Sequence, residues 1–330
     1  MGFLVIGLGS MGKRRIRCLK TLACNEIIGF DLREDRRKEC EEKYQIETVK
    51  NINKIDLSLI SAMVISVPPE LHLDYIDIAI ANEIPAFIEA GVISHHTKEA
   101  IKLNESKSIF LAPSCTLKFH PVVKDIKEIL RSGKYGKITN FTFHSGQYLP
   151  DWHPWEDVKD FYVSNRETGG AREIVPFELT WLIDVFGLPK EIKGFFSKTM
   201  NVGADIEDTY AFNIRFENGI GSVIVDVVGR FATRNLIVNL EKAQIRWNWE
   251  EGTLKVFEAE QNRWIHYYQP EGKAELGYNK NIIEQMYVDE IRAFIDGIKD
   301  KAKYPNSIEK DLQVLELLDA IENSDGGFKR

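Results

Sequence analysis

Hydrophobic residues in the first third of the chain occur in short runs that charged segments separate. Unbroken apolar runs of this length are typical of strands buried in a parallel sheet, and the intervening segments have the periodicity of helices. Regular alternation of strand and helix predicts a doubly wound parallel sheet of the α/β class. The predicted strands are residues 3–6, 27–30, 62–67, 86–88 and 109–112, and the predicted helices are residues 11–23, 35–44 and 71–81.

The pattern changes after about residue 117, where segments of strand character follow one another. Glu217, Asn218 and Gly219 carry the Asn-Gly signal of a tight hairpin. Successive strands joined by short turns predict an α+β domain with an open, mostly antiparallel sheet and helices on one face. The predicted strands are residues 138–144, 192–198, 208–216, 221–228, 235–239, 244–249, 254–258 and 264–268, and the predicted helices are residues 121–132, 172–186, 282–298 and 308–321. We therefore expect two domains, residues 1–117 and 118–330.

The length of the chain agrees with two domains, and its charge and apolar runs exclude other classes of protein. The chain of 330 residues exceeds what one hydrophobic core usually serves. Its net charge of −7 is mild and its charges are interleaved, so the sequence lacks the basic stripe of a nucleic-acid-binding protein. No apolar run approaches the roughly 18 residues of a membrane-spanning helix. The opening apolar run lacks the basic segment of a signal peptide, which favours a strand instead.

The four cysteines suggest neither disulfides nor a metal. Cys18, Cys24, Cys40 and Cys115 form no Cys-x-x-Cys pair and have no zinc-like spacing. We therefore expect reduced thiols, no metal site and a cytoplasmic location.

A glycine motif, residues 7–12 (GLGSMG), follows the first strand and opens the first helix. Glycines in such a turn let backbone N–H groups approach a pyrophosphate. Asp31 ends the second strand and follows Gly12 by 19 residues (31 − 12), near the spacing of roughly 20 for an acidic partner of the adenosine ribose. The alternative is a structural glycine turn beside a surface aspartate. The predicted cofactor-binding residues here are Gly7, Gly9, Ser10, Met11, Gly12 and Asp31.

Asp31 also predicts which dinucleotide binds. Its carboxylate would accept hydrogen bonds from both ribose hydroxyls and repel a 2′-phosphate, so we expect NAD(H) rather than NADP(H). Three cations, Lys13, Arg14 and Arg15, follow the motif and would attract a phosphate. We favour the other interpretation of these cations, a solvated first helical turn.

Several further segments resemble the Gfo/Idh/MocA oxidoreductase family. Residues 64–72 (VISVPPELH) are similar to the family's strand that ends in a small residue and proline, with a histidine soon after. Residues 114–121 (SCTLKFHP) resemble its domain junction, where Asn and Arg are more usual than Thr116 and Lys118. Gly169 and Gly170 before a helix that ends at Phe186, and the aromatic helix near Tyr287, extend the resemblance over nearly the whole chain. The further cofactor-binding residues that it implies are Ser66, Val67, Pro68, His72 and Glu89.

The resemblance implies an N-terminal Rossmann domain that binds NAD and a homodimer or homotetramer formed through the open sheet. Residues 146–155 (GQYLPDWHPW) resemble the substrate-facing loop of a sugar-acting subset, although they could equally be an aromatic cluster that closes the sheet. The implied reaction is hydride transfer to or from a carbon of a sugar, amino sugar or sugar nucleotide. The candidate substrate-binding residues are Tyr148, Trp152, His153, Arg172 and Glu173.

The catalytic pattern of the family is missing. Its members usually carry Glu-Lys-Pro after the fifth strand, whereas this chain has Glu89, Ala90 and Gly91. The family's aspartate, histidine and aspartate of the later helix fall on Ile174, Phe177 and Thr180. The candidate catalytic residues are therefore Lys118, Glu178 and His153, each of which has an ordinary structural alternative such as ion pairing or helix capping. Loss of these groups also leaves open an NAD-binding regulatory or ligand-binding protein with weak turnover.

Overall fold

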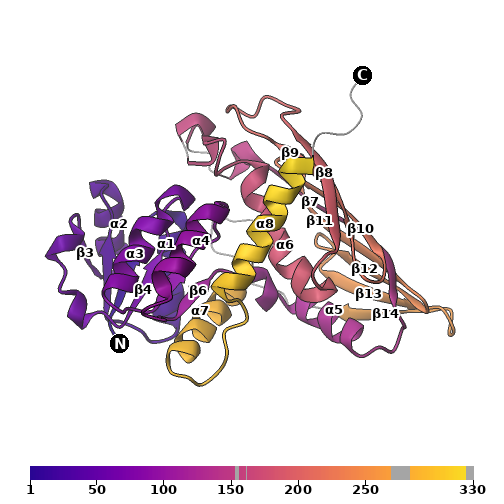
Figure 1. Ribbon diagram of the computed structural model, residues 1–330, viewed down its shortest axis with the longest axis horizontal. Coiled ribbons are helices and arrows are strands. Elements are labelled where there is room, and N and C mark those ends of the chain that lie inside the picture. The colour runs from indigo at the N-terminus through magenta and orange to yellow at the C-terminus, as the bar shows by residue number, and fades with distance from the viewer. Residues whose placement is uncertain (153–155, 161, 269–282, 325–330) are drawn as a thin grey trace. The chain divides into compact units, whose positions relative to one another are not determined.

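The computed structural model describes residues 1–152, 156–160, 162–268 and 283–324 (Figure 1). The chain divides into two compact units. The first comprises residues 1–116 and 284–313, and the second comprises residues 117–283 and 314–330.

The first unit contains a six-stranded parallel sheet in the order β3-β2-β1-β4-β5-β6. The predicted doubly wound sheet is confirmed, and the central strands are fully buried because helices cover both faces. The strands are β1 (Phe3–Ile6), β2 (Ile27–Phe30), β3 (Glu47–Val49), β4 (Ala62–Ile65), β5 (Ala86–Ile88) and β6 (Leu111–Pro113), and the helices are α1 (Ser10–Thr21), α2 (Glu34–Tyr44), α3 (His72–Ala81), α4 (Ser94–Asn104) and α7 (Glu284–Ile298).

The second unit contains an eight-stranded sheet in the order β14-β13-β12-β11-β7-β10-β9-β8. Its neighbours are antiparallel except for the parallel pair β7–β10, which confirms the predicted mostly antiparallel sheet. Its strands are β7 (Ile138–Tyr148), β8 (Glu191–Ser197), β9 (Thr209–Arg215), β10 (Ile220–Asp226), β11 (Val228–Leu240), β12 (Ala243–Asn248), β13 (Thr253–Glu258) and β14 (Arg263–Tyr268), and its helices include α5 (Pro121–Arg131), α6 (Ala171–Phe186) and the end of α8 (Ile308–Ser324).

The hairpin predicted from the Asn-Gly pair joins β9 to β10. Phe216 donates its backbone N–H to the carbonyl of Gly219 over 3.1 Å. Gly219 has a φ of +106°, a conformation that side-chain-bearing residues rarely adopt. The turn therefore requires glycine at this position.

Aromatic side chains hold α6 against one face of the second sheet. Phe141 and Phe143 of β7 are buried, whereas Thr142 between them is exposed. The ring of Phe141 stacks on Phe186 with centroids 4.2 Å apart, and Phe143 meets Trp181 edge to face at 5.3 Å. The alternation of β7 thus buries one face of the sheet and leaves the other uncovered by this helix.

Helix α7 differs from the sequence-based division, which assigned it to the second domain. The structure includes residues 284–313 in the first unit. The apolar side of α7 explains this, because the ring of Phe294 lies 5.8 Å from that of Phe87 and 5.7 Å from that of Phe110. Phe87 and Phe110 precede Phe294 by 207 (294 − 87) and 184 (294 − 110) positions, so the local pattern of α7 could not indicate these contacts.

A buried ion pair stabilises the core of the second unit. Glu178 of α6 is fully buried and accepts hydrogen bonds from Ser145 Oγ at 2.9 Å and from Trp181 Nε1 at 2.6 Å. Arg234 of β11 is also buried, pairs with Glu178, and lies 4.0 Å from the ring centre of Trp249. Each buried charge therefore has its counter-charge and hydrogen bonds.

Replacing Arg234 by methionine should destabilise the protein, because it leaves the Glu178 carboxylate buried without a cation. We expect the free energy of unfolding to fall by about 3–5 kcal/mol, measured by urea denaturation. Arg215→Met is the control, since Arg215 forms its ion pair with Glu191 at the exposed surface and its loss should have no measurable effect. Equal stability of the two variants would contradict this role for Arg234.

Candidate functional site

The glycine motif forms a tight turn between β1 and α1. Gly7 has a φ of +88°, and a Cβ on it would lie 2.5 Å from the carbonyl oxygen of Ser66. A Cβ on Gly12 would lie 1.8 Å from the oxygen of Gly7. A Cβ on Gly9 would meet only Arg36, at an ordinary 3.6 Å. The protein's own packing therefore explains Gly7 and Gly12, whereas Gly9 keeps the backbone open to a ligand.

The start of α1 suits an anionic ligand. Gly9 is the N-cap residue and supplies no side-chain hydrogen bond, and the first turn of α1 contains no acidic side chain. The partial positive charge of a helix N-terminus attracts anions, and no carboxylate of this turn neutralises it. A pyrophosphate fits this arrangement.

Asp31 lies at the end of β2 and connects the glycine turn to the segment that follows β2. Its Oδ2 accepts the backbone N–H of Leu8 and its Oδ1 that of Arg33, each at 2.8 Å. Arg36 Nη1 lies 3.6 Å from Oδ2. A carboxylate oxygen can accept more than one hydrogen bond, so Asp31 keeps capacity for the two hydroxyls of a ribose. The residues present thus fit a dinucleotide.

Other predicted cofactor residues follow β4 and β5 at the same edge of the sheet. Ser66 Oγ lies 3.4 Å from Glu89 Oε1. His72 is buried and donates its Nε2–H to the carbonyl of Val67 over 2.9 Å, which fixes the turn that contains Pro68. Burial lowers the pKa of His72 to about 4, so its ring is neutral at pH 7. The structure brings all the predicted cofactor residues to the carboxyl ends of the parallel strands, where doubly wound folds bind ligands.

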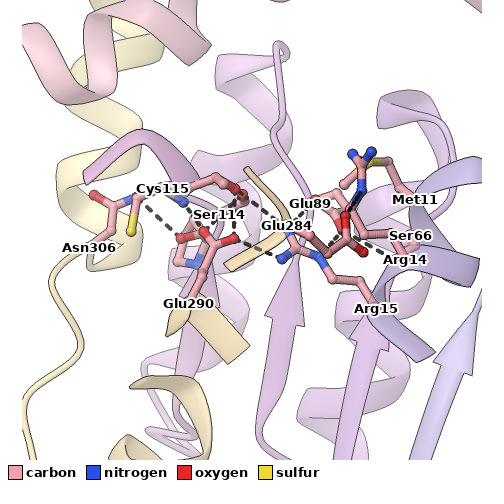
Figure 2. Close-up of polar contacts among 12 residues, drawn as sticks. Met11, Arg14, Arg15, Ser66, Glu89, Ser114, Cys115, Glu284, Glu290 and Asn306 are labelled. Atoms are coloured by element: carbon pink, nitrogen blue, oxygen red, sulfur yellow. Dashed lines mark hydrogen bonds and ion pairs between the residues drawn. The ribbon is translucent and has the colours of Figure 1, made fainter. Parts of the chain in front are cut away.

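The predicted solvated turn at Lys13, Arg14 and Arg15 is wrong for the two arginines. Arg14 and Arg15 are buried, and Arg14 pairs with Glu284 of α7 at 3.3 Å. Arg15 pairs with Glu89 and with Glu290 of α7 (Figure 2). Carboxylates far from residues 14 and 15 in the sequence compensate these charges, which is why the local sequence could not indicate their burial.

The candidate substrate residues lie in the second unit. The guanidinium carbon of Arg230 lies 3.9 Å from the ring centre of Tyr148. Trp152 follows a turn at the end of β7, and its buried Nε1 has no acceptor among the described residues. Arg172 pairs with Glu322 of α8 at 2.7 Å.

Glu173 accepts a hydrogen bond from Tyr162 at 2.6 Å. Arg172 and Glu173 therefore pair with different residues, and each has a structural partner within its own unit. Their substrate roles stay predictions.

The three candidate catalytic residues have different surroundings. Glu178 has no exposed surface and is enclosed by hydrogen bonds, so it cannot contact a substrate and we do not propose it as a proton donor. Lys118 is half-buried in the turn Thr116–Phe119. His153 lies outside the described residues. Lys118 and His153 stay predictions.

Glu290, Arg36 and Arg234 were not identified from the sequence. A weak signal existed for Glu290, which lies four positions from both Met286 and Phe294 and hence on the apolar side of α7. A carboxylate on a buried helix face requires a partner. The sequence does not reveal that this partner is Arg15.

Two further features, a metal site and a membrane-spanning helix, receive no support over the described part of the chain. Residues 1–152, 156–160, 162–268 and 283–324 contain no cluster of His, Cys, Asp or Glu suited to a metal. Within the same ranges, no helix combines the length and apolar character that crossing a membrane requires.

Comparisons with known proteins agree with this geometry. Residues 1–108 match the model of an oxidoreductase family with an NAD-binding Rossmann fold, and residues 123–254 match the Gfo/Idh/MocA C-terminal domain. No curated protein sequence matches the chain significantly.

Solved structures share the fold at low sequence identity. An oxidoreductase from Agrobacterium radiobacter in complex with NAD+, L-tartaric acid and magnesium has a TM-score of 0.85 at 16% identity, over 99% of this chain and 96% of that one. Levoglucosan dehydrogenase with NADH and levoglucosan has a TM-score of 0.82 at 17% identity, over 98% and 96%. A probable dehydrogenase from Thermotoga maritima has 0.80 at 19% identity, over 98% and 96%. The chain belongs to the Gfo/Idh/MocA family of oxidoreductases and carries an NAD-binding Rossmann domain.

Proposed function

We propose that the protein is an NAD(H)-dependent oxidoreductase that acts on a sugar, amino sugar or sugar nucleotide. The observation that carries this proposal is the turn at residues 7–12 together with Asp31, a site that accepts a dinucleotide. When bound, NAD(H) supplies the hydride acceptor or donor. The chain contributes the anion site at the start of α1 and the acceptor for the adenosine ribose.

The charge at Asp31 supports NAD(H) as the preferred cofactor. A 2′-phosphate next to this carboxylate would be repelled, and the nearby Arg36 is already drawn toward Asp31 at 3.6 Å. The exposed fraction of Asp31 is 7%, so little water is available to screen the repulsion.

Replacing Asp31 by asparagine tests this preference. The amide keeps an oxygen for one backbone N–H but loses the charge, so the affinity for NAD+ should fall about 10- to 100-fold while that for NADP+ rises. Adding Arg36→Ala should remove the gain for NADP+, because Arg36 is then the cation that receives the phosphate. Isothermal titration measures both affinities. Asp35→Asn is the matched control, since Asp35 pairs at the surface with Arg33. An unchanged preference for NAD+ over NADP+ in Asp31→Asn would refute the role of Asp31 in selecting NAD(H).

Aromatic residues support a sugar-like substrate. Tyr148 and Trp152 come from the loop whose sequence resembles the substrate loop of sugar-acting members, and flat rings suit the C–H faces of sugars. Structures that share the fold include a levoglucosan dehydrogenase with its sugar and an oxidoreductase with L-tartaric acid. Both ligands carry hydroxylated carbons, the type of carbon to or from which this hydride transfer takes place.

The proton donor must differ from the usual lysine, because Ala90 has nothing to titrate. With Glu178 enclosed, Lys118 and His153 are the candidates that we retain. An NAD-binding regulator with weak turnover is the second candidate function, and the absence of a titratable group at residue 90 favours it.

An assay for NADH formation or consumption across a panel of sugars and sugar nucleotides decides between the two functions. We expect turnover with at least one compound, and a fall in kcat of about 100-fold or more in Lys118→Ala or His153→Ala, whichever residue is the donor. Lys124→Ala is the control, because Lys124 is exposed on α5. Nucleotide binding without turnover on any compound would instead support the regulator.

We also propose that the open face of the second sheet forms a homodimer or homotetramer. Phe195 and Ile224 pair with Ala211 in register and therefore share one face, on which they are 66% and 44% exposed. Exposed apolar groups in a sheet favour burial against a second copy. Sedimentation should show an oligomer that Phe195→Lys/Ile224→Lys dissociates; a monomeric wild-type protein would contradict this.

A further inference from the structure

Arg15 lies between two carboxylates in the first unit. Its Nε and Nη2 donate to the two oxygens of Glu89 at 2.6 and 2.9 Å, and its Nη1 donates to Oε2 of Glu290 at 2.8 Å (Figure 2). Arg15 and Glu290 have no exposed surface. Three residues from α1, the end of β5 and α7 thus form one buried charge cluster, called here the Arg15 cluster.

The guanidinium is held in one orientation. Its carbon lies 4.4 Å from the ring centre of Phe87 and 5.2 Å from that of Tyr287. Burial acts to lower the pKa of Arg15, but attraction by Glu89 and Glu290 outweighs it and the pKa lies well above the usual value. Arg15 is therefore a permanent cation whose planar fork fixes the direction of the Glu89 carboxylate.

Glu290 is fully occupied by other donors as well. Its carboxylate accepts hydrogen bonds from Ser114 Oγ at 3.1 Å, from Thr116 Oγ1 at 2.6 Å and from the backbone N–H of Cys115. A group enclosed in this way cannot touch a cofactor. Arg15 bonds both carboxylates and therefore links Glu290 to Glu89.

Glu89 is the member of the cluster that reaches the surface, because 11% of its side chain is exposed. The strand order places β4 and β5 on the opposite side of β1 from β2 and Asp31. A dinucleotide whose adenosine ribose binds Asp31 and whose pyrophosphate binds at α1 extends toward the ends of β4 and β5. Ser66 and Glu89 therefore belong to the nicotinamide half of the site.

The charges of the Arg15 cluster do not cancel. Arg15 divides its charge between Glu89 and Glu290, so it leaves part of the negative charge of Glu89 uncancelled, and the neighbouring cations Arg14 and Arg17 pair with Glu284 instead. The nicotinamide ring is positively charged in NAD+ and neutral in NADH. An excess negative charge near this ring attracts only the oxidised form.

We propose that Arg15 and Glu290 are positioning residues that hold Glu89 at the nicotinamide half of the site and keep its negative charge from being cancelled. This charge increases the preference of the protein for NAD+ over NADH. This inference rests on the proposed function, because it requires a dinucleotide in the site. It assigns α7, from the far end of the sequence, to the cofactor-binding machinery.

The test measures the dissociation constants of NAD+ and NADH by titration calorimetry for the wild-type chain and for Glu290→Gln. Without the charge of Glu290, Arg15 neutralises Glu89. We expect the preference for NAD+ over NADH to fall about fivefold, although residue 290 touches neither nucleotide. Glu89→Gln should shift the preference in the same direction.

Glu178→Gln is the matched control, because it removes a fully buried, arginine-paired carboxylate from the other unit. It should lower the melting temperature and leave the preference unchanged. If Glu290→Gln lowers the melting temperature but weakens the binding of NAD+ and NADH by the same factor, the role of Glu290 is only structural and the inference is overturned. If Glu290→Gln does not fold, Glu89→Gln is the deciding variant. An unchanged preference for NAD+ over NADH in Glu89→Gln also overturns the inference. Absence of nucleotide binding to the wild-type chain would instead refute the proposed function.

Discussion

An arginine without exposed surface requires opposite charge along its guanidinium, and Arg15 obtains it from Glu89 and Glu290. This requirement shapes the first unit. Arg15 lies one turn after Gly12, so the same ion pairs fix the helix whose N-terminus forms the anion site. They also tie α7 to the end of β5. The phosphate turn, the strand end and a helix from the far end of the chain thus depend on one interaction.

The two units contrast in how their polar residues are used. In the first unit, Asp31 keeps acceptor capacity beyond its bonds to Leu8 and Arg33, and the start of α1 has no acidic cap. In the second, Glu178 and Arg172 are engaged by partners of their own unit. The cofactor half therefore has the character of a prepared binding site, whereas these polar residues of the second unit serve the packing of that unit.

Much of the fold followed from local pattern, because burial of apolar runs and the preference of glycine for positive φ act within a few residues. The strands at residues 3–6, 27–30 and 86–88 and the hairpin at Gly219 are examples. The edge strand β3 was missed because it has three residues, none of them fully buried. The glycine turn of residues 7–12 was recognisable from a contiguous motif. The burial of Arg15 and the enclosure of Glu178 depend on partners far away in sequence, which no local pattern encodes.

Construction of the first unit from residues 1–116 and 284–313 has a consequence for biosynthesis. The ribosome releases Arg15 and Glu89 long before it makes Glu290, so the nascent Rossmann segment exposes the apolar surface around Phe87 and Phe110 while the whole second sheet is translated. Folding of the amino-terminal half is then completed only after α7 has been made. Premature termination before α7 would release a chain with an uncovered core, which chaperones or proteases would have to remove.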